Sequence, residues 1–309
     1  MALLLTSFFG APAEWRKLFA AQMPDLDVRI WPEVGNEADI EVAAVTTLPR
    51  GKLRSSFPNL KMIVSLLAGA DVLLSDPDLP DVPIVRAGNP DGDEMMSEAA
   101  LVHVLRHHRH LPAYWAAQQR CEWISLPRLR ARERKVGVMG LGVIGLPVAK
   151  ALAAHGFAVA GWVRSPRRHD GIETFAGREQ LPAFLARSEI VVNLLPLTPE
   201  TRGILNAGAF AQMPRGGAIV NLGRGAHVVE ADLMVALDAD HLAGATLDVF
   251  PVEPLPKESP LWRHSKITIT PHVARRIDAS ELVPNICGAI RAFQAGRPLE
   301  HLIDRKRGY

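Results

Sequence analysis

The sequence predicts an α/β fold in which two domains each contain a doubly wound, parallel sheet. Three observations predict it. Short apolar runs alternate with amphipathic segments, a glycine-rich turn joins a strand to a helix in mid-chain, and 309 residues suffice for two domains with separate cores. This alternation is typical of parallel strands connected by helices.

The first hundred residues contain the first series of strands. Apolar runs predict strands at 2–9, 27–31, 40–45, 61–67 and 83–87, and residues 13–23 have the spacing of an amphipathic helix. A stretch rich in Ala, Leu and His then predicts a long helix over 94–120. A connector rich in Pro and Arg, 125–135, leads into the second series.

A glycine-rich turn opens the second series. An apolar strand at 136–139 leads into Gly140-Leu141-Gly142-Val143-Ile144-Gly145, and an Ala-rich helical pattern and a strand at 158–163 follow. The first two glycines let the backbone turn and approach a pyrophosphate, and the third lets helix and strand pack closely. The helix N-terminus supplies N–H donors to the phosphates. The context favours a dinucleotide site over an ordinary tight turn.

Basic residues follow the strand at 158–163. In a dinucleotide fold this strand end reaches the adenosine ribose, where an acid selects NAD. Here Val163 and Arg164 stand at that position, and no acid occurs before Asp170. Arginine offers planar, bidentate donors to a phosphate. We therefore predict a receptor for the 2′-phosphate of NADP rather than an ordinary solvated loop, formed by Arg164, Ser165, Arg167 and Arg168.

Charged residues also follow three later apolar runs. Arg224 comes after 217–222, Asp248 ends 243–248 with Glu253 five residues on, and His272 follows 266–270. Ligands bind at the carboxyl ends of parallel strands. Reduction of a 2-oxo acid needs a cation for the carboxylate, a proton donor for the carbonyl oxygen, and an anion that holds the donor imidazole protonated. Singly, each residue has a structural explanation; in order after a dinucleotide turn, they predict this chemistry.

Composition excludes several classes of protein. A net charge of +2 argues against a nucleic-acid-binding surface, and no apolar stretch approaches the ~20 residues that span a bilayer. The apolar amino terminus has no Lys or Arg before Arg16, so we expect a buried strand rather than a signal peptide. Two cysteines, Cys121 and Cys287, suggest a reducing compartment. A cytoplasmic protein is expected.

Two histidines have a spacing that can bind zinc. His103 and His107 lie four residues apart in the expected helix 94–120. The acid of an HExxH motif is missing, and the sequence suggests no third ligand. We predict no metal site, and expect a basic helix face or a subunit contact instead.

The motifs named so far occur in the order of a known family. "GLGVIG", "LLPLTPET", "VNLGRG", "LDVFPVEPLP" and "TPHVA" resemble the signatures of the D-isomer-specific 2-hydroxyacid dehydrogenases. "GWVRSPRR", "FAGREQL", "SPLWRH" and "DRKRGY" resemble the glyoxylate/hydroxypyruvate reductase A branch. The resemblance covers nearly the whole chain and is densest over 136–275.

The resemblance implies roles for the site residues. Hydride would pass from NADPH to C2 of a small 2-oxo acid, such as glyoxylate or hydroxypyruvate, while His272 protonates the carbonyl oxygen. Glu253 would pair with His272, and Arg224 would bind and polarise the substrate. Backbone amides around Leu67, Ala68 and Gly69 would receive its carboxylate. Further cofactor contacts would come from Val143, Ile144, Leu195, Pro196, Thr201, Leu222, Gly223 and Asp248.

The resemblance also implies the organisation of the molecule. Residues 1–98 and 274–309 would form a discontinuous, flavodoxin-like substrate domain, 99–273 would form the Rossmann domain, and the active-site cleft would lie between them. Dimerisation would use roughly 98–135, which predicts a homodimer. Two positions depart from the family pattern, Leu67, where Gly is frequent, and the region near Ala44, where an aromatic residue is expected. Both bear on substrate preference.

Other functions remain open on the sequence. The same scaffold could act on a different 2-hydroxy or 2-oxo acid, or oxidise D-3-phosphoglycerate, formate or phosphite. The basic strand end disfavours the NAD-linked members. A nucleotide-sensing protein without catalysis is the alternative from another class, and the complete set of Arg224, Glu253 and His272 argues against it.

Overall fold

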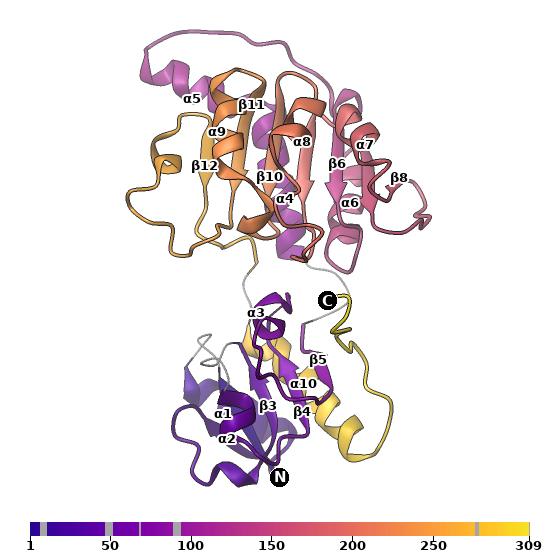
Figure 1. Cartoon of the computed structure of the whole chain (residues 1–309). Helices are drawn as coiled ribbons and strands as arrows, with labels where there is room; N and C mark the ends of the chain where they lie inside the picture. Colours follow the sequence, from indigo (N-terminus) through magenta and orange to yellow (C-terminus); the bar gives the residue numbers. More distant parts are fainter. Residues whose placement is uncertain (7–10, 47–51, 68, 89–93, 276–277, 309) are drawn as a thin grey trace. The chain divides into compact units, whose positions relative to one another are not determined.

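The computed structural model describes residues 1–6, 11–46, 52–67, 69–88, 94–275 and 278–308. Contacts divide the chain into two compact units, which Figure 1 shows as two sheets with their own helices. The first unit comprises Met1–Asn89 and Ile277–Tyr309, and is therefore discontinuous; the second comprises Pro90–Arg276. The predicted domain limits, and the cleft predicted between the domains, stay predictions.

The first unit contains a five-stranded sheet. Its order is β2-β1-β3-β4-β5, and every neighbouring pair is parallel. All five residues of β1 are buried, which is the pattern of a parallel strand covered on both faces. The strands are β1 Ala2–Thr6, β2 Asp27–Ile30, β3 Ile40–Val45, β4 Met62–Ser65 and β5 Ile84–Arg86.

Helices cover both faces of this sheet. α1 (Pro12–Gln22) and α10 (Ala279–Gln294) pack on one face, where Trp15 and Phe19 of α1 share a buried cluster with Ile286 of α10. α2 (Lys52–Ser56) and α3 (Asp71–Leu74) cover the other face, and the short, exposed helix η1 (Glu37–Asp39) directly precedes β3. Each large side chain buried in this way contributes roughly 1.5–3 kcal/mol. The carboxyl-terminal helix α10 thus covers part of one face of the amino-terminal sheet.

The second unit contains a seven-stranded parallel sheet. Its order is β12-β11-β10-β9-β6-β7-β8, so the chain reverses direction across the sheet at β6 and β9. The strands are β6 Lys135–Met139, β7 Ala158–Val163, β8 Glu173–Ala176, β9 Ile190–Asn193, β10 Gly217–Asn221, β11 Leu242–Leu247 and β12 Ile267–Ile269. The two parallel-sheet α/β domains that the sequence predicts are confirmed.

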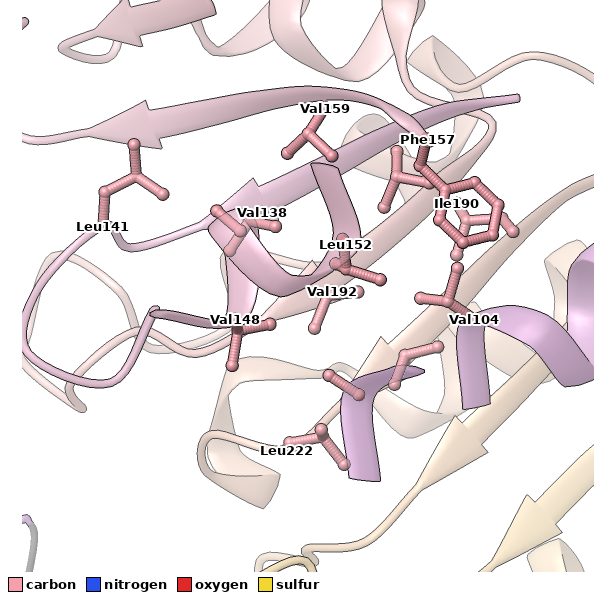
Figure 2. Packing of buried hydrophobic residues seen from close by; sticks show 14 of the residues in the cluster. Val104, Val138, Leu141, Val148, Leu152, Phe157, Val159, Ile190, Val192 and Leu222 are labelled. Carbon is pink, nitrogen blue, oxygen red and sulfur yellow. The ribbon is translucent and has the colours of Figure 1, made fainter. Parts of the chain in front are cut away.

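Two apolar layers hold this second sheet. α4 (Glu94–His108) and α6 (Gly145–Ala154) pack on one face, and Figure 2 shows Val104 of α4 and Leu152 of α6 converging with Val138 and Val192 of the sheet. α7 (Leu181–Arg187), α8 (Ala207–Gln212) and α9 (Glu230–Asp238) pack on the other face. The remaining helices of this unit are α5 (Leu111–Gln119), η2 (Ala131–Glu133), η3 (Gly225–His227) and η4 (Pro260–Arg263).

The single helix predicted over 94–120 is wrong, because the chain forms two helices there. α4 ends at His108, His110 adopts a left-handed φ of 58°, and α5 begins at Leu111 with Pro112 in its first turn. Proline lacks the N–H that would continue the helix and its ring would clash with a preceding carbonyl. Strand β8 at the sheet edge is an element that the sequence analysis did not predict.

The described residues contain neither a membrane-spanning helix nor a cluster of metal ligands. Among them, no helix is long and apolar enough to cross a membrane. Within the same ranges, no three His, Cys, Asp or Glu side chains gather in a way that could hold a metal ion. Both cysteines are free thiols, Cys121 exposed and Cys287 buried against the first sheet.

Candidate active site

Four neighbouring strands of the second sheet lead into the predicted site residues. Leu195 follows β9, Arg224 follows β10, Asp248 follows β11, and His272 follows β12. The strands are parallel and adjacent, so their carboxyl ends lie along one edge of the sheet. The topology therefore brings these four residues to the same edge, where ligands bind in open α/β sheets.

His272 and Glu253 are in hydrogen-bond contact at this edge. Glu253 Oε2 lies 2.7 Å from His272 Nδ1, while Glu253 Oε1 accepts a hydrogen bond from the Phe250 N–H at 2.8 Å. The His272 side chain is 51% exposed and that of Glu253 36%. The backbone thus orients the carboxylate, the carboxylate orients the imidazole, and Nε2 is left to meet a ligand. This is the arrangement of an aligned proton donor.

Asp248 holds the turn that carries His272. Its carboxylate accepts hydrogen bonds from the Thr270 hydroxyl at 2.6 Å, the Val273 N–H at 2.9 Å and the Ala274 N–H at 3.0 Å. Its carbonyl oxygen accepts from the His272 N–H at 2.8 Å. His272 has a φ of 53°, a conformation that costs a non-glycine residue energy. The buried Asp248 therefore fixes His272 in this conformation.

The turn that carries Arg224 packs directly against the loop of Glu253. A Cβ atom added at Gly225 would overlap the backbone of Phe250, so only glycine permits this approach. Arg224 Nη1 donates to the Gly223 carbonyl at 2.8 Å, and the Arg224 side chain is partly buried. Gly225 thus places the loops of Arg224 and Glu253 in contact, which the sequence analysis did not foresee.

The glycine-rich turn between β6 and α6 has the geometry of a phosphate cradle. Gly140 has a φ of +92°, and a Cβ at Gly145 would overlap the carbonyl oxygen of Gly140. Gly142 is exposed with open space around its Cα, and Val143 is half exposed. The turn is therefore closed by backbone contacts on its inner side and open on its outer side, toward which a pyrophosphate could approach.

The basic residues beyond β7 are all exposed. A carboxylate from another loop, that of Glu200, also lies within electrostatic reach of Arg164. A hydrogen bond from Thr198 is the main reason that the pKa of Glu200 lies below its usual value, and the charges of Arg178 and Arg164 lower it further. Glu200 lies 36 residues further along the chain than Arg164, so its proximity could not be foreseen from the sequence. The four exposed residues are Arg164, Ser165, Arg167 and Arg168.

The predicted carboxylate-binding loop follows β4 in the first unit. Leu67 and Gly69 are partly exposed, and the Leu67 carbonyl accepts from the Ser65 hydroxyl at 3.3 Å. Ala68 lies outside the described residues. Ala44 is fully buried in the apolar cluster under α1 and α10, so its side chain is a core contact and not part of a pocket wall.

Comparison with known proteins decides the family. Residues 101–274, more than half of the chain, match the description "D-isomer specific 2-hydroxyacid dehydrogenase, NAD binding domain". Glyoxylate/hydroxypyruvate reductase A of Serratia proteamaculans is 40% identical over 308 residues, covering 98% of this chain and 97% of that relative. This chain belongs to the D-isomer specific 2-hydroxyacid dehydrogenases. The resemblance read from the motifs is confirmed.

Solved structures of this dehydrogenase family have the same fold. A D-isomer specific 2-hydroxyacid dehydrogenase from Xanthobacter autotrophicus, in complex with NADPH and MES, is 43% identical with a TM-score of 0.94, covering 100% of this chain and 99% of that one. An NADPH-dependent glyoxylate/hydroxypyruvate reductase from Sinorhizobium meliloti, in complex with NADP and sulfate, is 39% identical with a TM-score of 0.92 and full coverage of both.

Five of the cofactor residues predicted for this dehydrogenase follow β9 or β10: Leu195, Pro196, Thr201, Leu222 and Gly223. The Thr201 hydroxyl donates to the Pro196 carbonyl at 2.7 Å and thereby closes the turn after β9. Leu195 is nearly buried beneath that turn, and the Leu222 side chain is packed in the core. A Cβ at Gly223 would lie 3.1 Å from Asn193 Nδ2. Any contact from Leu222 to a ligand would therefore use its backbone.

The structure corrects one of the two expectations for His107, the exposed basic face, and the subunit contact stays a prediction. Its ring does not form an exposed basic face, because Nε2 lies 2.9 Å from the Thr246 hydroxyl of β11 and the ring abuts Gly244. Burial lowers the pKa of His107 to about 3, so the ring is neutral. Burial also lowers the pKa of His103, whose Nδ1 has no hydrogen-bond partner in the described chain. These histidines belong to the packing of α4 on the sheet.

Arg86 is a further residue that the sequence did not single out. It ends β5 in register with Ser65, which ends the strand leading into the Leu67 loop. Its Nε atom is buried and has no hydrogen-bond partner among the described residues, and burial lowers its pKa. A buried Nε without a hydrogen-bond partner costs stability, which distinguishes Arg86 from an ordinary surface arginine.

Proposed function

We propose that this dehydrogenase is an NADPH-dependent reductase of small 2-oxo acids, converting glyoxylate to glycolate and hydroxypyruvate to D-glycerate. The observation that carries the proposal is the 2.7 Å pair of His272 and Glu253 on a turn held by Asp248. Relatives named glyoxylate/hydroxypyruvate reductase A support the substrate class. Similar structures in complex with NADPH and NADP support the cofactor.

Each residue at the sheet edge has one task in this reaction. NADPH, when bound, supplies hydride from C4 of its nicotinamide to C2 of the oxo acid. His272 donates the proton on Nε2 to the carbonyl oxygen, and Glu253 holds the imidazole turned toward the substrate. The guanidinium of Arg224 binds the substrate and polarises its carbonyl group. The product is a 2-hydroxy acid.

Two further groups of residues hold the ligands. Backbone N–H groups around Leu67, Ala68 and Gly69 receive the substrate carboxylate. The Gly140–Gly145 turn and the N-terminus of α6 hold the pyrophosphate. The open outer side of the turn, at Gly142, supports this assignment. The 2′-phosphate is received by the exposed cations beyond β7, and the carboxylate of Glu200 is a counter-charge for Arg164 before NADPH binds. These cations are Arg164, Arg167 and Arg168, with the hydroxyl of Ser165.

Initial rates test the proposed function. The purified protein is given glyoxylate or hydroxypyruvate with NADPH or NADH, as wild type and as His272→Ala, with the exposed His155→Ala as the matched control. We expect turnover that favours NADPH, a loss of about a hundredfold or more in His272→Ala, and an unchanged rate in His155→Ala. Binding of NADPH without turnover of either acid would contradict the proposal and favour a nucleotide sensor.

We further propose a homodimer that works in the cytoplasm. Three large apolar side chains between 94 and 135 support the dimer: Val102 is 60% exposed, Trp115 47% and Trp123 fully exposed. Such side chains mark interaction surfaces. The two free thiols support a reducing compartment. Sedimentation of the protein in solution measures its assembled mass, and a monomer at micromolar concentration would contradict the dimer.

A further inference from the structure

Three buried polar side chains lie directly beneath the proposed site. Asn193 ends β9, Asn221 ends β10, and His227 ends the short turn η3; all three are fully buried. Asn193 Nδ2 donates to Asn221 Oδ1 at 2.8 Å and also lies 2.8 Å from His227 Nδ1. Buried polar groups of this kind are costly unless their hydrogen bonds are satisfied, and satisfied networks fix one local geometry.

The hydrogen bonds determine which His227 nitrogen carries the proton. The Leu195 N–H donates to Asn193 Oδ1 at 3.3 Å, so the NH₂ group of Asn193 faces His227. The Arg224 N–H also points at His227 Nδ1, at 3.2 Å. With two donors aimed at it, Nδ1 is an acceptor. Nε2, 3.2 Å from the Pro196 carbonyl oxygen, is therefore the donor.

The two sides of the His227 ring reach two different loops. On the Nδ1 side, the ring accepts from the Arg224 N–H, while Asn221 Nδ2 donates to the Arg224 carbonyl at 3.0 Å. Both backbone polar groups of Arg224 are thus held. On the Nε2 side, the ring donates to the Pro196 carbonyl, the oxygen that also accepts from the Thr201 hydroxyl. One ring joins the turn of Arg224 to the turn after β9.

We propose that His227 is a positioning residue that aligns the substrate-binding Arg224 through Nδ1 and the cofactor-lining Pro196 turn through Nε2. The inference rests on the proposed function, because it assigns the ring to the two ligands of that reaction. The fully buried ring of His227 would act through these two loops and not by direct contact with either ligand. Its contribution is to hold the two loops at a fixed distance and orientation, so that the oxo acid and the cofactor are kept in the reacting geometry.

A merely structural histidine in the same unit provides a matched comparison. His241 Nε2 lies 2.8 Å from the Phe210 carbonyl oxygen and 3.1 Å from that of Met213, so its ring also bonds to backbone groups. Those carbonyls belong to α8 and the residue after it, not to the strand-end loops. Removal of the His241 ring should weaken the fold without changing either ligand's affinity, whereas removal of the His227 ring should change both.

Two amide substitutions separate the two sides of the ring. In His227→Asn, the amide oxygen stands near the former Nδ1 and still accepts from Arg224, but the bond to Pro196 is lost. In His227→Gln, the longer side chain places its NH₂ near the former Nε2 and reaches Pro196, but the acceptor for Arg224 is lost. A third variant, Thr201→Val, removes the other donor to the Pro196 carbonyl without touching Arg224.

The experiment measures the Kd of NADPH on the protein without substrate, together with kcat and the KM of glyoxylate. We expect His227→Asn and Thr201→Val to weaken NADPH binding by about tenfold, with the KM of glyoxylate within about threefold of wild type. We expect His227→Gln to raise the KM of glyoxylate and lower kcat, for a combined loss of about ten- to hundredfold in kcat/KM, with the Kd of NADPH nearly unchanged.

Controls distinguish this proposal from a structural role and from failure of the proposed function. Thermal unfolding of each variant is compared with that of His241→Asn and His241→Gln. The proposal would be overturned if His227→Asn and His227→Gln changed the Kd of NADPH and the kcat/KM of glyoxylate by equal factors. It would also be overturned if the His241 variants lost as much kcat/KM as the His227 variants. If the wild-type protein turns over no oxo acid, the proposed function fails, yet the expected difference in NADPH affinity between His227→Asn and His227→Gln still tests the Pro196 side.

Discussion

The His272–Glu253 pair and the layer of side chains beneath it differ most in their access to solvent. The His272 and Glu253 side chains are 51% and 36% exposed, whereas Asp248 is 1% exposed and Asn193 and Asn221 are fully buried. In the exposed pair, His272 Nε2 is available to a ligand. The described hydrogen bonds of Asp248, Asn193 and Asn221 all go to other groups of the protein. Chemistry and geometry are therefore assigned to different residues of the same sheet edge.

This difference has an energetic consequence. An exposed ion pair contributes little to stability, typically ~0–1 kcal/mol, so the pair can be arranged for reaction. A buried carboxylate with three donors is costly to remove, because each buried donor left without a partner lowers the free energy of unfolding by about 1–3 kcal/mol. Substitutions in the exposed pair should therefore change activity alone, and substitutions in the buried layer should change activity and stability together.

Substitution of Asp248 is expected to have the largest effect. Asp248→Ala removes the acceptor for the Thr270 hydroxyl and for the Val273 and Ala274 N–H groups, so the left-handed turn of His272 loses its support. We expect kcat/KM to fall by about a thousandfold and the free energy of unfolding to fall by about 3–5 kcal/mol. Steady-state rates and urea denaturation measure the two quantities.

A milder variant serves as the control for Asp248. Thr270→Val removes one of the three donors and leaves both N–H bonds in place, so we expect about a tenfold loss of kcat/KM and roughly 1 kcal/mol of stability. An Asp248→Ala protein that is less stable but keeps its kcat within threefold would show that the buried carboxylate does not position His272.

Glu253→Gln comes next, and should separate activity from stability. The amide oxygen can still accept from the Phe250 N–H, but the amide NH₂ then faces His272 Nδ1 and forces that nitrogen to accept. The carboxylate that orients the imidazole for proton donation is then replaced by a neutral group. We expect kcat to fall about a hundredfold, with the free energy of unfolding within about 1 kcal/mol of wild type.

The nearby Glu258→Gln provides the matched control for charge, because Glu258 is exposed on the same connection between β11 and β12. It should leave kcat unchanged. A Glu253→Gln protein that is as active as Glu258→Gln would mean that the carboxylate beside His272 has no part in proton donation.

The positions of the site residues could be predicted from the sequence, but their hydrogen bonds could not. The strand ends at Arg224, Asp248 and His272 follow from local apolar runs and from the rule that parallel strands end at one edge. The bracing of His272 by Asp248 was not predictable, since it depends on hydrogen bonds between residues 25 and 26 positions apart. Local pattern identifies where chemistry occurs, whereas long-range hydrogen bonds determine how it is aligned.

The helix break and the buried histidine illustrate the two kinds of error. The break before α5 had a local signal, because Pro112 follows His110 by two residues, and the apolar pattern of 94–120 concealed it. His107 had no such signal. Its hydroxyl partner, Thr246, lies 139 residues further along the chain, so the sequence alone could not tell a buried ring from an exposed one.

Substitution of His107 is expected to have the smallest effect, a change in stability without a change in activity, and tests the contrast between exposed and buried side chains. Its pKa is lowered by burial from 6.5 to about 3, so an unfolded chain binds a proton there at pH 5.5 and the folded chain does not. The stability contributed by the neutral ring is therefore complete above pH 6.5 and is lost as the pH falls toward 3. The expected slope for this one group is about 1.4 kcal/mol per pH unit.

Denaturation of wild type and His107→Gln at pH 7.5, 6.5 and 5.5 isolates that slope. Glutamine keeps an amide beside the Thr246 hydroxyl and cannot titrate, so any lost contact lowers stability equally at all three pH values. We expect wild type to lose about 1 kcal/mol more than His107→Gln between pH 7.5 and 5.5, and the exposed His155→Gln to follow wild type. Parallel curves for His107→Gln and wild type would mean that the ring is accessible to protons in the folded state, and that α4 does not seal this side of the sheet.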